Sequence, residues 1–144
     1  QMCIRDRLTR GIQMRNQTVL LRGVNDKSEV LGELLRGLTA MNVAPYYIFQ
    51  CRPVTGVKGR FQVPIAEGIG IVDGAKAMQS GLGKAVRYAM SHPRGKIEMI
   101  GRLPDTDETI FKFHQNKYPE DNARIFTRKL SEHDTWLDEE LNPV

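Results

Sequence analysis

Apolar residues in the first half of the chain alternate between short continuous runs and helical spacing. The run over residues 18–21 is typical of a strand buried on both faces of a parallel sheet. Apolar residues then recur every three or four positions over 30–41, which predicts an amphipathic helix with Asp26 as its cap and Asn42 at its end. The aromatic and β-branched run over 46–51 predicts a second strand. Together these segments predict a βαβ unit with parallel neighbouring strands.

The pattern continues with one more helix and then changes. Pro64 favours a helix start, because its missing N–H costs nothing in a first turn. Three glycines inside the apolar repeat that follows, Gly68, Gly70 and Gly74, weaken this helix or indicate close packing. Beyond it, turn-forming residues separate short strand-like runs over 86–90, 96–100, 109–113 and 123–127.

These patterns divide the chain into three parts. Residues 1–7 look like translated sequencing adapter, and we exclude them from the fold prediction. Residues 8–82 contain the predicted βα units, and residues 83–144 form a β-rich C-terminal extension. The predicted fold class is therefore α/β.

Composition and net charge limit the kinds of binding partner that the chain is expected to have. With 40% hydrophobic and 26% charged residues, the chain is typical of a globular protein. No apolar run approaches the roughly 20 residues of a membrane span, and no secretory signal is evident, so we expect a cytoplasmic protein without a membrane partner. The net charge of +4 suits an anionic ligand or a plain basic surface. No basic stripe interleaved with aromatic residues indicates nucleic-acid binding.

The candidate chemistry lies at strand ends and in one turn. In βα architectures, ligands bind at the C-terminal ends of strands, which selects residues 22–26 and 50–52. The basic loop that follows Arg52 is either an anion site or a solvated loop. Lys96 could form a Schiff base or be simply solvated, and His92 could act as an acid or base or sit in a turn.

Four ordered segments resemble the lysine 2,3-aminomutase family of radical S-adenosylmethionine enzymes. Residues 16–26 read NQTVLLRGVND, and residues 45–51 read PYYIFQC, which resembles a PYYxxQC strand of that family. Residues 61–64 and 80–81 resemble the boundaries of the helix that follows. The resemblance extends from about residue 8 to residue 101.

The resemblance implies a fold, a set of cofactors and an N-terminal half that lies outside this chain. It implies the last βα units of a partial parallel (β/α) barrel, followed by the β-rich extension. The family uses a [4Fe–4S] cluster and S-adenosylmethionine to make a radical, and pyridoxal phosphate to carry the migrating amino group. The chain has two cysteines, Cys3 and Cys51, so it cannot supply the three thiolates of such a cluster. We therefore expect the cluster ligands in an N-terminal half outside this chain, and no radical activity from the chain alone.

The resemblance also assigns individual residues. Gln17 corresponds to a glutamine that contacts S-adenosylmethionine, and Lys96 to the catalytic lysine that binds pyridoxal phosphate. The approach to Lys96 is two residues shorter than in the family. Arg52 and Ser91 occupy the positions of two aspartates that hold the side-chain ammonium group in lysine-specific members.

The exchange of a carboxylate for a guanidinium reverses the charge that the substrate pocket attracts. We therefore expect a small-molecule amino acid substrate that is acidic rather than lysine. Two alternatives remain open: a family member that performs another radical reaction without pyridoxal phosphate, and a non-catalytic module that binds an anion. The sequence is also compatible with a homo-oligomer.

Overall fold

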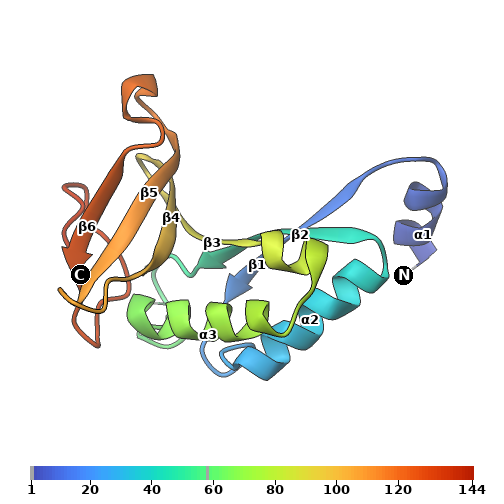
Figure 1. Cartoon of the computed structure of the whole chain (residues 1–144), viewed down its shortest axis with the longest axis horizontal. Helices are drawn as coiled ribbons and strands as arrows, with labels where there is room; N and C mark the ends of the chain where they lie inside the picture. The colour runs from blue at the N-terminus through green and yellow to red at the C-terminus, as the bar shows by residue number, and fades with distance from the viewer. Residues whose placement is uncertain (1, 58) are drawn as a thin grey trace.

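The computed structural model describes residues 2–57 and 59–144 of the chain (Figure 1). Its helices are α1 (Met2–Thr9), α2 (Ser28–Ala40) and α3 (Ile65–Ala77), with short 3-10 turns η1 (Gly81–Ala85) and η2 (Pro119–Asp121). Its strands are β1 (Met14–Leu20), β2 (Val43–Gln50), β3 (Arg87–His92), β4 (Gly95–Arg102), β5 (Glu108–Asn116) and β6 (Ile125–Lys129). The predicted α/β class is confirmed.

All six strands form one mixed sheet in the order β1-β2-β3-β4-β5-β6. The pairs β1–β2 and β2–β3 are parallel, whereas every later pair is antiparallel. The predicted βαβ unit and the predicted strands beyond residue 86 are therefore confirmed. The sheet passes without interruption across the predicted boundary at residues 82 and 83, because β3 still pairs in parallel with β2. The partial barrel remains a prediction, since the described strands form an open sheet.

Helices α2 and α3 lie side by side along one face of the parallel strands (Figure 1). The core forms between them, where Leu20, Ile48 and Met90 of the sheet and Leu31 and Leu35 of α2 are buried. The other face of β1 is uncovered: its residues alternate between exposed and half-buried, and Val19 is 42% exposed. The prediction of a strand buried on both faces was wrong, because the helices cover only one side of β1.

Close packing explains two of the three glycines in α3. A Cβ atom on Gly68 would collide with the ring and hydroxyl of Tyr88, and one on Gly74 would collide with the side chain of Ser28. Gly70 faces open space. The predicted cap of α2 was wrong: Lys27 stands at the N-cap, and Asp26 instead accepts a hydrogen bond from Arg22.

The C-terminal tail (residues 131–144) returns to the βα units. The backbone N–H of Ile65 donates to the carbonyl oxygen of Asp134 over 2.8 Å, at the start of α3. The side-chain amide of Gln50 donates to the carbonyl oxygen of Thr135, also over 2.8 Å. The tail therefore satisfies polar groups at the C-terminal end of β2 and at the N-terminus of α3.

Candidate functional site

The uncovered face of the sheet carries a cavity of about 420 Å³, which we call the site cavity. Its walls include all four residues selected from the sequence, Gln17, Arg52, Ser91 and Lys96, together with the ring of Phe49. These residues come from four different segments of the chain. The fold therefore brings together a set that the sequence spreads over 80 positions.

Strand register explains why these side chains share one face. Val19 of β1 pairs with Phe49 of β2, and Ser91 of β3 pairs with Lys96 of β4. Directly paired residues project to the same side of a sheet, as do residues two positions apart along a strand. Arg52 follows the C-terminal end of β2, where ligands of βα folds bind.

Two cations converge on one hydroxyl group in what we call the Arg52–Ser91–Lys96 cluster. The guanidinium of Arg52 donates to Ser91 Oγ over 2.8 Å, and the ammonium of Lys96 donates to the same oxygen over 2.5 Å. A serine oxygen has two lone pairs and one hydrogen. Because both lone pairs accept, the hydroxyl hydrogen points away from the two cations and is free to donate. The cluster thus presents three kinds of donor to a ligand.

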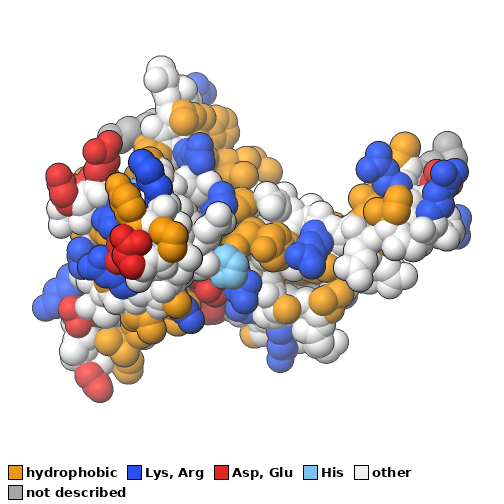
Figure 2. Space-filling view, turned by 90° about the horizontal axis from the view of Figure 1, so that it is seen from above, with side chains coloured by type: hydrophobic (Ala, Val, Ile, Leu, Met, Phe, Trp, Pro, Cys, Tyr) orange, Lys and Arg blue, Asp and Glu red, His pale blue; other side chains and the backbone are white. Residues whose placement is uncertain are grey.

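The charge of the site cavity is positive. Among the described residues that line it, none is an aspartate or glutamate, and neither Arg52 nor Lys96 forms an ion pair within the described part of the chain. Lys96 also lies over the Phe49 ring, 4.9 Å from its centroid. Acidic side chains gather instead at the end of the molecule that carries the antiparallel strands (Figure 2). Of the predicted basic loop, Lys58 lies outside the described residues.

A neighbouring cavity of about 430 Å³ shares Gln17 and Lys96 with the site cavity and is also lined by Tyr47 and His114. Burial, with a contribution from Tyr46, raises the pKa of Tyr47 to about 12, so its hydroxyl stays protonated. The His114 ring lies edge-on to the Tyr47 ring, with centroids 5.8 Å apart. Sequence analysis missed Tyr47, Phe49 and His114; their alternate positions along predicted strands were the available signal.

Two other residues from the sequence-selected regions, Asn25 and Gln50, have structural roles. Asn25 closes its own loop, since its side chain accepts from the Leu21 N–H and donates to the Val19 carbonyl. Gln50 is 2% exposed and accepts a hydrogen bond from the hydroxyl of Tyr88 on the helix-covered side. Asn25 and Arg52 both follow the C-terminal ends of the parallel strands β1 and β2, but Asn25 does not line the site cavity.

His92 is held in its neutral form. Its Nδ1 atom accepts from the Arg94 N–H over 3.1 Å, so the ring hydrogen is on Nε2, which lies 3.2 Å from the Leu137 carbonyl oxygen and 3.1 Å from that of Asp138. Burial lowers the pKa of His92, and the two carbonyl groups partly oppose that shift. This histidine therefore anchors the C-terminal tail.

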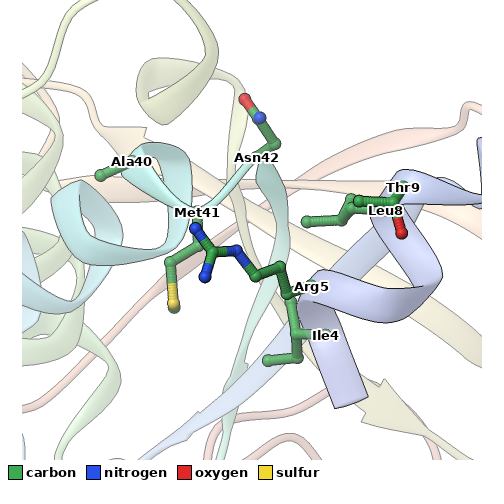
Figure 3. A pocket seen from close by; sticks show the side chains of 7 residues that line it. All are labelled: Ile4, Arg5, Leu8, Thr9, Ala40, Met41 and Asn42. Atoms are coloured by element: carbon green, nitrogen blue, oxygen red, sulfur yellow. The ribbon is translucent and has the colours of Figure 1, made fainter. Parts of the chain in front are cut away.

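A larger cavity of about 570 Å³ lies between α1 and the end of α2. Figure 3 shows that Ile4, Arg5 and Leu8 of α1 face Met41 and Asn42 across it. Two of its seven lining residues, Ile4 and Arg5, thus come from the segment that resembles sequencing adapter. We assign no function to this cavity.

In residues 2–57 and 59–144, no group of three or more histidine, cysteine, aspartate or glutamate side chains is arranged to hold a metal ion. Cys3 is exposed, whereas Cys51 is buried and has a raised thiol pKa because of that burial. No helix of the described part of the chain has the length and apolar character needed to cross a membrane.

Comparison with known proteins identifies relatives of this chain. No family model matches it. A protein of Aquifex aeolicus (strain VF5) named "Putative L-lysine 2,3-aminomutase" is 42% identical over 130 residues, which are 90% of this chain and 34% of that protein. L-lysine 2,3-aminomutases of Fusobacterium nucleatum and Clostridium subterminale are each 44% identical over 71 residues, or 49% of this chain and 16% and 17% of those proteins. The matches fall mostly in the C-terminal part of these relatives, and the chain spans about a third of the Aquifex protein.

Proposed function

Because this chain belongs to the lysine 2,3-aminomutase family, we propose that it is the C-terminal part of a longer radical S-adenosylmethionine enzyme that rearranges an amino acid. The [4Fe–4S] cluster is then held by an N-terminal part outside this chain, and the chain alone has no radical activity. Gln17 lies on the uncovered face of β1 and lines the site cavity, which supports its proposed contact with S-adenosylmethionine.

The Arg52–Ser91–Lys96 cluster is the observation that carries the substrate proposal. Two cations and one free hydroxyl hydrogen face a cavity whose described lining has no acidic residue. The planar guanidinium of Arg52 can pair with a carboxylate through two hydrogen bonds. A substrate ammonium there would meet two positive charges within reach, which is unfavourable by Coulomb repulsion. The substrate is therefore an acidic amino acid rather than lysine.

The residues around Lys96 fit pyridoxal phosphate in two respects. Lys96 supplies the amine that the cofactor's aldehyde requires, and Phe49 supplies an apolar ring surface. When bound, pyridoxal phosphate would carry the amino group of the substrate during its migration. Ser91 fixes the direction of the Lys96 amine, because it accepts one of that amine's hydrogens.

Two other functions are consistent with the same cluster. A family member that works without pyridoxal phosphate would use Lys96 only as a cation. A non-catalytic module would bind an anion through Arg52 and Lys96 without any radical chemistry. The site cavity favours an enzyme over the bare module, because Gln17 and Phe49 belong to it as well as the two cations.

The substrate proposal is tested by reversing the charge of Arg52 in the full-length protein. We expect the unmodified enzyme to turn over glutamate in preference to lysine. Arg52→Asp should reduce this preference at least about tenfold, or roughly 1.4 kcal/mol of discrimination. The double variant Arg52→Asp, Ser91→Asp, which restores both family aspartates, should shift it further toward lysine.

Arg60→Asp is the matched control, because Arg60 carries the same charge in the same loop but does not line the site cavity. It should leave the preference unchanged. Equal turnover of lysine and glutamate by the unmodified enzyme, or an equal effect of the Arg52 and Arg60 variants, would contradict the proposal.

A further inference from the structure

The Arg52–Ser91 pair separates the site cavity from a second cavity of about 260 Å³, which we call the tail cavity. Arg52, Val54 and Ser91 line both cavities. The remaining walls of the tail cavity are Pro53, Pro93 and Trp136, and all of them are apolar or aromatic. An anion bound by Arg52 and Ser91 would therefore lie next to the apolar walls of the tail cavity.

Trp136 reaches this place because the C-terminal tail is firmly held. Its ring stacks on the buried ring of His92, with centroids 6.3 Å apart and planes at 28°. Its backbone exchanges two hydrogen bonds with Val144, over 3.1 and 3.0 Å. The neighbouring residue Leu137 is fully buried and its carbonyl oxygen contacts the His92 ring. The indole is thus a fixed wall rather than a mobile side chain.

Size and polarity indicate what the tail cavity can hold. A wall of two prolines, a valine and an indole offers almost no hydrogen-bonding groups apart from those of Arg52 and Ser91. Such a surface stabilises an apolar group by removing it from water, by about 25 cal/mol per Å² of apolar surface buried. Charged or amide groups would lose their water there without finding new partners.

From this arrangement we infer that the tail cavity is an apolar subsite, and that the ligand is a carboxylate attached to a compact hydrocarbon group. The carboxylate binds Arg52 and Ser91, the chain that carries the amino group extends into the site cavity, and a hydrocarbon substituent on the carbon beside the carboxylate lies against Val54 and Trp136. The inference rests on the proposed anion-binding function of Arg52 and adds to it the part of the substrate next to the charge. It makes Trp136 a residue that determines specificity.

Three small probes separate the two halves of this site by calorimetry or NMR titration on the full-length protein. Benzoate carries the charge and an apolar ring, acetate carries the charge alone, and benzamide carries the ring without the charge. We expect benzoate to bind at least about tenfold more tightly than acetate, because its ring is removed from water against the apolar wall of the tail cavity. Benzoate should also bind more tightly than benzamide.

Variants then assign each preference to its cavity. Trp136→Ala and Val54→Ser should each reduce the ratio of benzoate to acetate affinity at least threefold, while the preference for benzoate over benzamide remains. Arg52→Gln should instead reduce the preference for benzoate over benzamide and leave the ratio of benzoate to acetate affinity unchanged. Val54 is 51% exposed, so Val54→Ser is expected to fold even if Trp136→Ala does not. Val24→Ser, at a valine that is 61% exposed in another loop, is the control and should change neither ratio.

The outcomes distinguish the two proposals. Equal affinities for benzoate and acetate, or a ratio that Val54→Ser leaves unchanged, would overturn the apolar subsite while leaving the anion site intact. Equal affinities for benzoate and benzamide would overturn the anion site. If neither carboxylate binds, both proposals fail.

Discussion

Polar side chains on the two faces of the parallel strands differ in how far the protein itself satisfies their hydrogen-bonding groups. On the face covered by α2 and α3, Gln50 is buried and every polar atom of its amide group has a partner within the protein. On the uncovered face, Ser91 also contacts two partners, but both are cations without an acidic counterpart among the described residues. The hydrogen-bonding groups of the Gln50 amide are all used within the protein, whereas the groups around Ser91 can still donate hydrogen bonds to a ligand.

This difference teaches where function lies in a βα fold. Gln50 ends β2 and Arg52 follows two residues later, and both border the site cavity, yet Gln50 is 2% exposed and supports the core. Position at a strand end selects both residues equally. What distinguishes them is whether their hydrogen-bonding groups are satisfied by the chain itself, and this is a property of the folded structure.

The largest effect should come from Lys96 on the uncovered face. In the full-length protein loaded with pyridoxal phosphate, borohydride should fix the cofactor to Lys96, and Lys96→Ala should abolish the adduct completely. Peptide mass spectrometry measures both. Lys84→Ala is the control, because Lys84 is exposed in η1 and lines none of the cavities described. An adduct on another lysine, or a well-folded protein without cofactor, would show that Lys96 lacks this role.

Substituting one glutamine on each face tests directly how the two faces differ in their contribution to the free energy of unfolding. Gln50→Leu should lower the free energy of unfolding by about 2–4 kcal/mol, since it leaves the Tyr88 hydroxyl and the carbonyl groups of Val63 and Thr135 without a partner. Gln17→Leu should change it by less than about 0.5 kcal/mol, because Gln17 is exposed. Chemical denaturation measures both. Similar losses in the two variants would mean that the faces do not differ as described.

Two glycines of α3 provide a smaller effect with opposite signs. Gly68→Ala should destabilise the protein by about 1–3 kcal/mol, because the added methyl group would displace the Tyr88 ring from its place beside Gln50. Gly70→Ala should stabilise it by up to about 1 kcal/mol, since alanine favours a helix and nothing lies within 4 Å. If both variants destabilise the protein, the close contact at Gly68 is not the cause.

The smallest effect concerns His92 and pH. Burial lowers the pKa of His92 below its value in the unfolded chain, about 6.5, so the fold favours the neutral ring. Its contribution should be complete above pH 6.5 and decline as the pH falls through the unfolded pKa, levelling off below the folded one. His92→Gln should flatten the decline measured between pH 7.5 and 5.5. His133→Gln, at an exposed histidine, should not.

The sequence predicted the order of elements well, because buried periodicity is a local property. The helices at 30–41 and 65–78 and the parallel pairing of β1 with β2 follow from apolar spacing and from the short connections. Resemblance to a family selected Gln17, Arg52, Ser91 and Lys96, and the structure places all four around one cavity.

The remainder depended on contacts that no local pattern encodes. Burial of both faces of β1 was predicted from four apolar residues, but burial depends on what covers a strand. Asp26 was expected to cap α2, but it accepts from Arg22, which also forms two hydrogen bonds with Glu67 of α3. The role of Trp136 beside the cluster could not be predicted, because the tail meets β3 only after the chain has folded back.

The bond from Gln50 to the Thr135 carbonyl joins residues 85 positions apart. During synthesis at about 5–20 residues per second, β2 therefore exists for at least several seconds before its partner emerges. Throughout that interval the amide of Gln50 lacks its full set of contacts, and the end of β2 stays open to water. Completion of this part of the fold on the ribosome is thus expected to wait for residues 134 and 135, and a stalled chain that ends before residue 134 would be a natural target for proteases.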